Sequence, residues 1–292
     1  MPRAAPKSPN SVHSAAALKR LRSSRAFVFD MDGTLVLGDK TNHGLNPLPG
    51  ALEITNWLTD RGMPFVLFTN GTARTPQQYA GMLRDVGFPL PENGVMTPAS
   101  SAADLFRRHG YRRILTLGGE GLEKPLRDAG MEIVTPEGKP NVDAVLVGWF
   151  REFTMSALEA ACYAAWNGAK VYSCSQSLYF ATAQGKAIGT SRAISAMIKD
   201  LTGARIHVIG KPSLEALRCA ARQLGVGTKE LTAVGDDPSL EIPMALRGGA
   251  LAVAVNTGVG AADAYAHLPI KQRPHLAVRD VGELLSLYKG HR

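Results

Sequence analysis

Residues 26–32 read Ala-Phe-Val-Phe-Asp-Met-Asp, and this stretch decides the fold. Its four uninterrupted apolar residues are typical of a strand that is buried on both faces of a parallel sheet. The strand ends on two acids, Asp30 and Asp32, which are two residues apart. Ligands of such sheets bind just beyond the carboxyl ends of the strands, so both acids are candidate site residues.

The same pattern continues along the chain, because short apolar runs alternate with segments of helical spacing. One helix start is well marked by Thr75-Pro76-Gln77-Gln78, a capping box with proline at the first helical position. Further strands are expected at 64–68, 114–117, 144–147, 171–173, 206–209, 231–234 and 251–255. This alternation predicts an α/β fold with a doubly wound, Rossmann-like parallel sheet.

Several of the other predicted strands also end on polar residues. Thr69 and Asn70 follow one strand, Lys211 follows another, and Asp236 with Asp237 follows a third. Strand ends of one parallel sheet share an edge, so these side chains are expected to converge on the crevice that holds Asp30 and Asp32.

The residue types in this crevice favour phosphate chemistry. Asp30, Asp32 and Asp236 are hard oxygen ligands of the kind that Mg²⁺ prefers. If Asp30 attacks a phosphate dianion, two like charges about 4 Å apart repel by about 4 kcal/mol at an effective dielectric constant of 20. A metal ion and the cation of Lys211 are needed to offset that repulsion.

Each motif taken alone also has a plain structural interpretation. A strand-ending Asp-x-Asp is as often an Asx turn, and Thr69-Asn70-Gly71 or Gly210-Lys211-Pro212 can be ordinary loop residues. The order of the motifs carries more weight than any single one.

The ordered set resembles the four-motif signature of the haloacid dehalogenase (HAD) superfamily, at residues 29–35, 68–71, 209–213 and 234–242. The long gap between the second and third motifs is similar to subfamily IIA, the NagD-like and p-nitrophenyl-phosphatase-like enzymes. These enzymes insert an α/β cap domain of the C2 type in that gap. The resemblance therefore implies a HAD core with an inserted cap.

The resemblance also implies an activity, which is Mg²⁺-dependent hydrolysis of a small-molecule phosphomonoester. Asp30 would be the nucleophile that becomes an aspartyl-phosphate, and Asp32 would be the general acid and base. Mg²⁺ would be held by the side chains of Asp30 and Asp236 and by the main-chain oxygen of Asp32. Lys211 would neutralise the phosphoryl group and position Asp30.

Four further residues receive roles from the same resemblance. Thr69, Asn70 and Gly71 would bind the phosphoryl group together with Lys211. Glu241 stands where the subfamily usually carries Asp, and it would support the site from outside the metal's own ligands. The neighbouring Asp237 fills a variable position and is expected to have no role.

The resemblance divides the chain into a HAD core at 26–97 and 204–292 and a cap at 98–203. The cap departs from the subfamily pattern, because Ser173-Cys174-Ser175-Gln176-Ser177 replaces a stretch that usually reads Ala-Thr-Asn-Pro-Asp. This segment would cover the leaving group of the substrate. The loss of its acid leaves the identity of the phosphate ester open. Caps of this type often pair, so a homodimer through the cap is an expectation.

The net charge of +8 comes mainly from one end of the chain. Residues 1–25 hold six basic and no acidic residues, which leaves 27 basic against 25 acidic residues in the rest. We expect this leader to be a disordered tail and predict no nucleic-acid partner. An organellar targeting segment is the alternative, but Pro2, Pro6 and Pro9 disfavour an amphipathic helix there.

Neither the cysteines nor the apolar segments point to other classes. Cys162, Cys174 and Cys219 form no C-x-x-C pair, and no apolar run approaches the length of a membrane span. We therefore expect a cytoplasmic protein without membrane contact. The rival function is a non-catalytic, phosphate-binding or regulatory protein with the HAD fold, although Asp30, Asp32, Lys211 and Asp236 are all present.

Overall fold

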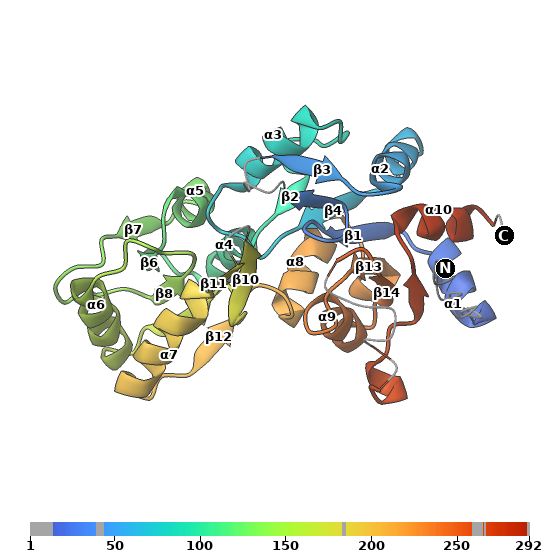
Figure 1. The fold of residues 1–292 in the computed structure, drawn as a ribbon. Coiled ribbons are helices and arrows are strands. Elements are labelled where there is room, and N and C mark those ends of the chain that lie inside the picture. The colour runs from blue at the N-terminus through green and yellow to red at the C-terminus, as the bar shows by residue number, and fades with distance from the viewer. Residues whose placement is uncertain (1–13, 39–43, 183–184, 259–264, 266, 291–292) are drawn as a thin grey trace, which may run out of the picture.

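The computed structural model describes residues 14–38, 44–182, 185–258, 265 and 267–290, and it contains two parallel sheets, each covered by helices on both faces (Figure 1). The larger sheet lies in the predicted core and has the order β15-β14-β13-β1-β4-β5. Its strands are β1 (Ala26–Asp30), β4 (Phe65–Phe68), β5 (Val95–Met96), β13 (Leu231–Gly235), β14 (Leu251–Val255) and β15 (Leu276–Val278). The doubly wound parallel sheet predicted from the sequence is confirmed.

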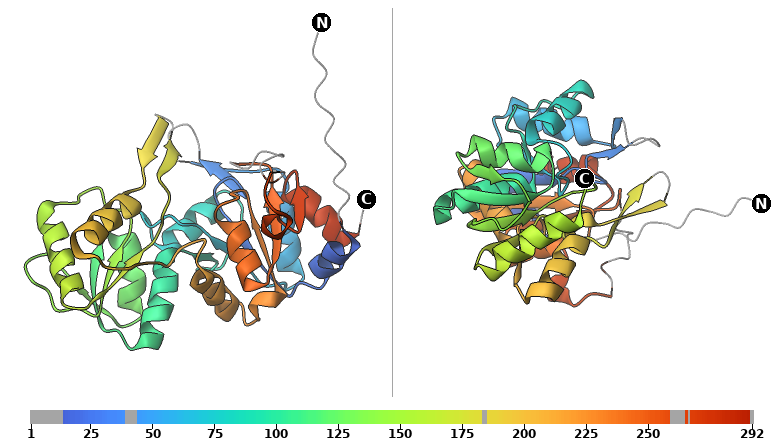
Figure 2. Two further views of the ribbon diagram at one scale, coloured as in Figure 1. Left: turned by 90° about the horizontal axis from the view of Figure 1, so that it is seen from below. Right: turned by 90° about the vertical axis from the view of Figure 1, so that its left-hand side faces the viewer.

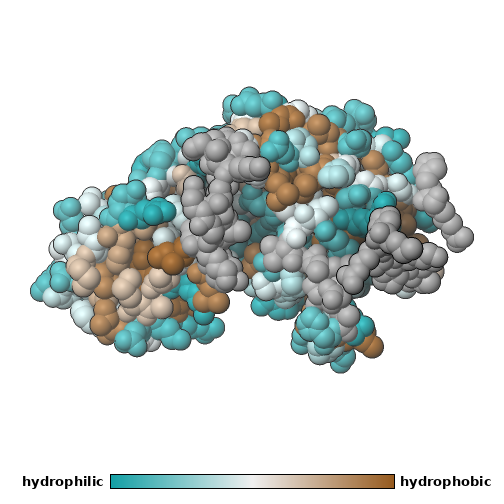
Figure 3. Space-filling view, viewed as in Figure 1, coloured by the Kyte–Doolittle hydropathy of each residue, from teal (hydrophilic) through white to brown (hydrophobic). Residues whose placement is uncertain are grey.

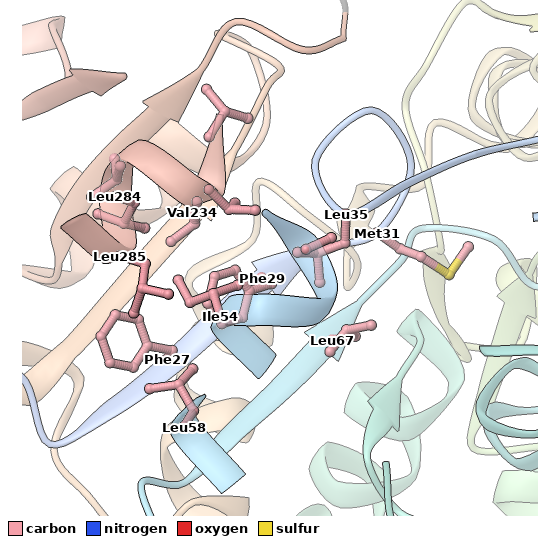
Figure 4. Packing of buried hydrophobic residues seen from close by; sticks show 14 of the residues in the cluster. Phe27, Phe29, Met31, Leu35, Ile54, Leu58, Leu67, Val234, Leu284 and Leu285 are labelled. Atoms are coloured by element: carbon pink, nitrogen blue, oxygen red, sulfur yellow. The ribbon is translucent and has the colours of Figure 1, made fainter. Parts of the chain in front are cut away.

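Two sets of helices cover the core sheet. One face holds α1 (Ala15–Arg22), α2 (Ala51–Asp60), α3 (Pro76–Asp85) and α10 (Val281–Lys289), and the other holds α8 (Leu214–Gln223) and α9 (Glu241–Gly248). Figure 4 shows Phe27 and Phe29 of β1 packed against Ile54 of α2 and Leu285 of α10. All five residues of β1 are buried because helices cover both of its faces.

The second sheet forms the cap and has the order β12-β9-β8-β6-β7. Its strands are β6 (Arg113–Leu117), β7 (Glu132–Val134), β8 (Ala144–Val147), β9 (Lys170–Ser173) and β12 (Ile206–Val208). Helices α4 (Pro98–His109) and α5 (Glu120–Asp128) cover one face, and α6 (Met155–Trp166) and α7 (Thr190–Thr202) cover the other. The inserted α/β cap is therefore confirmed.

Two antiparallel hairpins and two short 3₁₀ helices complete the fold. Strand β2 (Val36–Gly38) pairs with β3 (Leu45–Pro47), and β10 (Tyr179–Thr182) pairs with β11 (Gly185–Ile188). The β10–β11 hairpin projects from the cap at the boundary between the two domains (Figure 2). The 3₁₀ helices are η1 (Thr228–Glu230) and η2 (Ile270–Gln272).

The cap ends later in the chain than the sequence predicted. Residues from 204 onward were expected in the core, but β12 pairs in parallel with β9, with Ile206 opposite Val171. Backbone pairing therefore assigns β12 to the cap sheet. The chain returns to the core only after Val208, at the loop that contains Lys211.

The predicted disorder of the leader is wrong for the part that the structure describes. Helix α1 begins at a capping serine, since the Ser14 hydroxyl accepts a hydrogen bond from the Ala17 amide at 3.1 Å. Ala17 and Leu21, four residues apart, are buried on the core, and Arg20 donates to the Gly249 carbonyl at 2.9 Å. The prediction for residues 1–13 lies outside the described residues.

One smaller feature agrees with the sequence. The capping box at α3 is present, with Thr75 and Gln78 bonding each other's backbone amides at 3.1 and 2.8 Å. Among the described residues, no helix combines the length and apolar character needed to cross a bilayer.

Candidate active site

The predicted site residues meet at the carboxyl edge of the core sheet. Strand β1 ends at Asp30 and lies between β4, which leads into Thr69, and β13, which leads into Asp236. Lys211 comes from the loop that follows β12 of the cap. The crevice therefore contains residues from four distant parts of the chain. This is expected, because ligands of parallel sheets bind beyond the carboxyl ends of the strands.

Lys211 lies at the centre of a buried ionic cluster. Its ammonium group forms ion pairs with Asp30 and with Glu241, the latter at 2.7 Å, and donates to the Phe68 carbonyl at 2.8 Å. The side chains of these three charged residues are all less than a tenth exposed. Lys211 therefore holds the Asp30 carboxylate in a fixed position.

The charges in this cluster are strongly coupled. Burial opposes the charged form of Lys211, but the charges of Asp30 and Glu241 outweigh it and raise the pKa of the lysine. Burial also raises the pKa of Glu241 to about 8, where the attraction of Lys211 is countered by repulsion from Asp30 and Asp236. The described part of the crevice thus has more buried carboxyl groups than cations.

The arrangement around Asp236 fits a small divalent cation. The Thr34 hydroxyl lies 3.3 Å from Asp30 Oδ2 and 3.4 Å from Asp236 Oδ1, so both carboxylates flank one point. A Cβ atom on Gly33 or Gly258 would lie 2.6 or 1.9 Å from Asp236 Oδ2, so both positions require glycine beside this carboxylate. Two carboxylates beside a hydroxyl are hard oxygen donors of the kind that suits Mg²⁺.

Within the described residues, no group of three His, Cys, Asp or Glu side chains is arranged to hold a metal ion. The expected ligand set, which consists of the side chains of Asp30 and Asp236 and the main-chain oxygen of Asp32, stays a prediction.

The Asp32 carboxyl lies at the mouth of the crevice, next to Thr69. The Thr69 hydroxyl donates to Asp32 Oδ2 at 3.3 Å and accepts a hydrogen bond from the Gly71 amide at 3.0 Å. Although Asp32 remains exposed to solvent, desolvation by the surrounding protein, followed by the charge of Asp30, raises its pKa to about 6. A carboxyl group that titrates near neutrality can both donate and accept a proton.

The Asn70 side chain is engaged elsewhere than the sequence predicted. Its amide donates to the Lys211 carbonyl at 2.9 Å and its oxygen accepts from the Lys211 amide at 2.8 Å. Asn70 therefore holds the Lys211 loop in place. A Cβ on Gly210 would lie 2.1 Å from the Cys174 carbonyl oxygen and 2.7 Å from Asn70 Oδ1, so cap and core backbones meet here.

The cap segment 173–177 carries no charged side chain of its own. The Gln176 amide donates to the Ser173 hydroxyl at 2.9 Å, and the Ser175 hydroxyl donates to Ser177 Oγ at 3.1 Å. Arg192 of α7 donates to the Gln176 carbonyl at 2.9 Å. The segment is held by its own side chains and by Arg192.

Sequence reasoning missed three residues of the site. Thr34 lies inside the first motif and was passed over because a hydroxyl carries no charge. Thr257 donates to the Gly33 carbonyl at 2.6 Å, and Gly258 makes room for Asp236. Both follow the end of β14, a strand that the sequence predicted. Polar and glycine residues after that strand were therefore a signal that could have identified them. The Asp237 carboxylate, in contrast, accepts bonds from Ser239 in a surface turn, and the Asp237 backbone amide donates to Glu241 Oε2 at 3.3 Å.

Comparison with known proteins agrees with this geometry. A family model described as haloacid dehalogenase-like hydrolase matches residues 27–132, and a HAD-hydrolase-like model matches residues 208–284. The two matches cover both parts of the core and leave most of the cap between them. The chain belongs to the HAD superfamily of hydrolases.

Relatives place the chain more narrowly. Ribonucleotide monophosphatase NagD of Escherichia coli is 28% identical over 260 residues, which cover 88% of this chain and 96% of NagD. The structure of 4-nitrophenylphosphatase from Thermotoga maritima has a TM-score of 0.81 and 26% identity, covering 92% and 99% of the two chains. Glycerol phosphate phosphatase from Mycobacterium tuberculosis, solved with calcium, has a TM-score of 0.79 and 25% identity, covering 91% and 76%. The chain is a phosphoric monoester hydrolase of the NagD-like subfamily IIA.

Proposed function

We propose that this protein is a Mg²⁺-dependent phosphatase that hydrolyses a small-molecule phosphomonoester through an aspartyl-phosphate. The observation that carries the proposal is the buried Asp30 carboxylate, paired with Lys211 and flanked by Asp236 and Asp32 at one sheet edge. Mg²⁺ would be held by the carboxylates of Asp30 and Asp236 and by the Asp32 main-chain oxygen. It would supply positive charge against the phosphoryl oxygens.

The reaction follows from the roles that the side chains can take. An Asp30 oxygen forms a bond to phosphorus while the bond from phosphorus to the leaving-group oxygen breaks. Asp32 donates its proton to that oxygen. In the second half, Asp32 removes a proton from a water molecule, which attacks the phosphorus of the aspartyl-phosphate and releases inorganic phosphate and free Asp30.

Three groups support the phosphoryl oxygens during this exchange. Lys211 provides a buried cation, the Thr69 hydroxyl lies beside Asp32, and the backbone amide of Asn70 provides a further donor. The Gly71 amide donates to Thr69 Oγ1 and so holds that hydroxyl in place. Fixed donors in a crevice that excludes water stabilise developing charge better than solvent does. For Asn70 the proposal uses the main chain, because its side-chain amide is bound to the Lys211 loop.

Turnover of p-nitrophenyl phosphate, measured with and without added Mg²⁺ after treatment with a chelator, tests the proposal directly. We expect hydrolysis that disappears with the chelator and returns with Mg²⁺. A pure, folded protein that binds inorganic phosphate but hydrolyses nothing at any Mg²⁺ concentration would instead be a phosphate-binding or regulatory protein.

In this proposal, the cap determines which phosphate ester is hydrolysed. The named substrates of the relatives include ribonucleotides and glycerol phosphate, and the neutral segment 173–177 gives no charge by which to choose between such leaving groups. A panel of some dozens of phosphate esters, ranked by kcat/KM, identifies the class that this cap selects.

We also propose a homodimer through the cap and a cytoplasmic location. Apolar side chains gather on the cap in Figure 3, and its exposed residues include Met155, Ile188, Met197 and Leu201. A groove of about 500 Å³ between Trp149 and Met197 runs along the same side. Light scattering during gel filtration measures the mass in solution. The three free, buried cysteines suit a reducing compartment.

A further inference from the structure

A pocket separate from the catalytic crevice lies where the cap joins the core. Helix α4 of the cap and α8 of the core lie side by side there (Figure 1), and both contribute to its walls together with the edge strand β12. Ile209, which follows β12, also lines the pocket, so it lies on the segment by which the chain leaves the cap. Its volume of about 320 Å³ is at the lower end for ligand pockets and suits a ligand with one ring.

Aromatic rings from the cap sheet and from α4 line this pocket. Tyr172 of β9 and His207 of β12 are opposite each other in the sheet, and their ring centroids are 5.2 Å apart with an interplanar angle of 34°. His109, the last residue of α4, and Tyr111 form a second pair with centroids 5.4 Å apart. The buried Phe106 ring lies 4.8 Å from the ring of Tyr172 and 5.6 Å from that of Tyr111, and so connects the two pairs. Four ring side chains around one small pocket favour a planar ring as the ligand, because aromatic rings pack well against one another.

Two cations lie at one end of the pocket. Lys170 lines it, and Arg205 lies beside Lys170 because both directly precede a pair of residues that are opposite each other in the parallel register of β9 and β12. Both side chains are exposed, and neither forms an ion pair with a carboxylate of the described residues. Burial, followed by the charges of Arg205 and Lys170, lowers the pKa of His207, so this ring stays neutral near pH 7 between the two pairs of groups.

The carboxylates nearest to these cations are engaged by other groups. Glu215 of α8 lines the pocket, but it forms ion pairs with Arg108 of α4 and, at 2.7 Å, with Arg222 of its own helix. The Asp143 carbonyl accepts from the Lys170 amide, whereas the Asp143 carboxylate accepts from two backbone amides at the start of β6, at 2.7 and 2.9 Å. Lys170 therefore keeps its positive charge available to a bound anion.

We propose that this pocket binds a small planar anion, an acid with a single aromatic ring, at the boundary between cap and core. The ring of the ligand packs among Tyr172, His207 and Tyr111. Its acid group faces Lys170 and Arg205. The inference does not depend on the proposed function, because none of these residues belongs to the catalytic crevice.

Titration calorimetry of the full chain with benzoate as the probe tests the ring and the charge separately. Benzoate should bind with a Kd below about 10 mM, as expected for a ligand of so few atoms. Cyclohexanecarboxylate keeps the charge without the planar ring, and benzamide keeps the ring without the charge, so each should bind about 10-fold more weakly or worse. A benzoate Kd above about 10 mM, or equal affinity for benzoate and either analogue, overturns the proposal.

Exposed lysines on the two faces of the cap sheet locate the bound acid. Lys170→Gln removes a cation of the pocket and should weaken benzoate binding about 5-fold or more. Lys199→Gln is the matched control, because Lys199 is an exposed lysine of α7 on the opposite face of the sheet, and it should stay within about twofold of the parent. An unchanged affinity in Lys170→Gln, or an equal loss in both variants, overturns the proposal.

A pair of variants at His207 tests the contact with the ring. His207→Phe keeps a ring and should hold the benzoate affinity within about threefold, whereas His207→Ala should lower it about 5-fold or more. Equal affinities in the two variants, with thermal unfolding showing both folded, overturn the proposal. Calorimetry measures benzoate binding whether or not the protein hydrolyses phosphate esters, so failure of this inference and failure of the proposed function are distinguishable.

Discussion

The carboxyl edges of the two parallel sheets differ in charge. At the core edge, Asp30, Lys211 and Glu241 form a buried ionic cluster, whereas β9 of the cap leads into Ser173 and a neutral network of hydroxyl and amide groups. Both edges hold polar residues, as strand ends of parallel sheets do. The comparison teaches that edge position alone does not define a catalytic site. The two edges differ in that only the core edge, among the described residues, brings an ion-paired lysine and buried carboxyl groups together.

The largest expected effect comes from the nucleophile of the core edge. Asp30→Asn keeps the shape of the side chain, but an amide does not attack phosphorus, so kcat for p-nitrophenyl phosphate should fall by about 10³-fold or more. Asp237→Asn is the matched control, because the Asp237 carboxylate bonds to Ser239 in a surface turn and the backbone amide that donates to Glu241 is kept, and it should stay within about twofold of the parent. Substantial turnover by Asp30→Asn would contradict the covalent role.

Replacing Lys211 with a neutral residue tests whether the stability of the core depends on the charge balance of the ionic cluster. Lys211→Met leaves Asp30 and Glu241 buried without their partner, which should cost about 3–5 kcal/mol in the free energy of unfolding. Urea unfolding at pH 7 in the presence of a chelator measures it. The double variant Lys211→Met with Glu241→Gln should recover part of the loss. An unchanged unfolding midpoint for Lys211→Met would show that the cluster is not electrostatically coupled.

The space beside Asp236 can be closed without removing any charge. Gly33 has φ +87°, and a Cβ there would lie 2.6 Å from Asp236 Oδ2. Gly33→Ala should raise the Mg²⁺ concentration needed for half-maximal activity by about 10- to 100-fold. Gly62→Ala is the control, because Gly62 also has a positive φ of +60° but faces open space. The same Mg²⁺ requirement in both variants would argue against a cation at Asp236.

Between the two edges, ion pairs join α4 of the cap to α8 of the core. Arg222 bonds both Asp104 and Glu215, the latter at 2.7 Å. Burial alone would raise the pKa of Asp104, but its bonds and charge interactions with Arg222 and then Arg108 lower it below the usual value. This stabilisation is complete above the unfolded pKa, about 3.9, and is lost as the pH falls through the folded value.

Asp104→Asn should therefore lower the Tm slightly at pH 7, by about 1 kcal/mol or less in unfolding free energy, and the difference from the parent should shrink below pH 4 and in high salt. Thermal unfolding followed across pH measures this difference. Its persistence at pH 3 would mean that Asp104 contributes through packing instead of charge.

The smallest effect is expected at the neutral cap edge. Gln176→Ala removes the bond to Ser173 without touching a charge, so kcat for p-nitrophenyl phosphate should change by less than about threefold. The ranking of natural phosphate esters by kcat/KM should change more, because the segment faces the leaving group in our proposal. If all esters lose activity equally, the cap edge contributes to folding and not to selection.

The core and its motifs were predictable from the sequence because they obey local rules. The apolar run of β1 ending at Asp30 specifies a buried parallel strand and a polar edge. The capping box of α3 likewise depends on residues three apart. The domain boundary was placed too early, since β12 is assigned to the cap only by its pairing with β9. The folding of α1 was not predicted either, because this helix is stabilised by the burial of Leu21 against distant elements.

The sequence by itself determined the fold class, the superfamily and the ionisable residues of the site, because those properties follow from periodic patterns and from motifs in a fixed order. Tertiary structure alone decided how these residues are used. It turned Asn70 toward the Lys211 backbone, brought Glu241 to the lysine and packed Gly258 against the Asp236 carboxylate. The physical reason is that hydrogen bonds and close contacts between distant segments depend on three-dimensional distances, which no local spacing encodes.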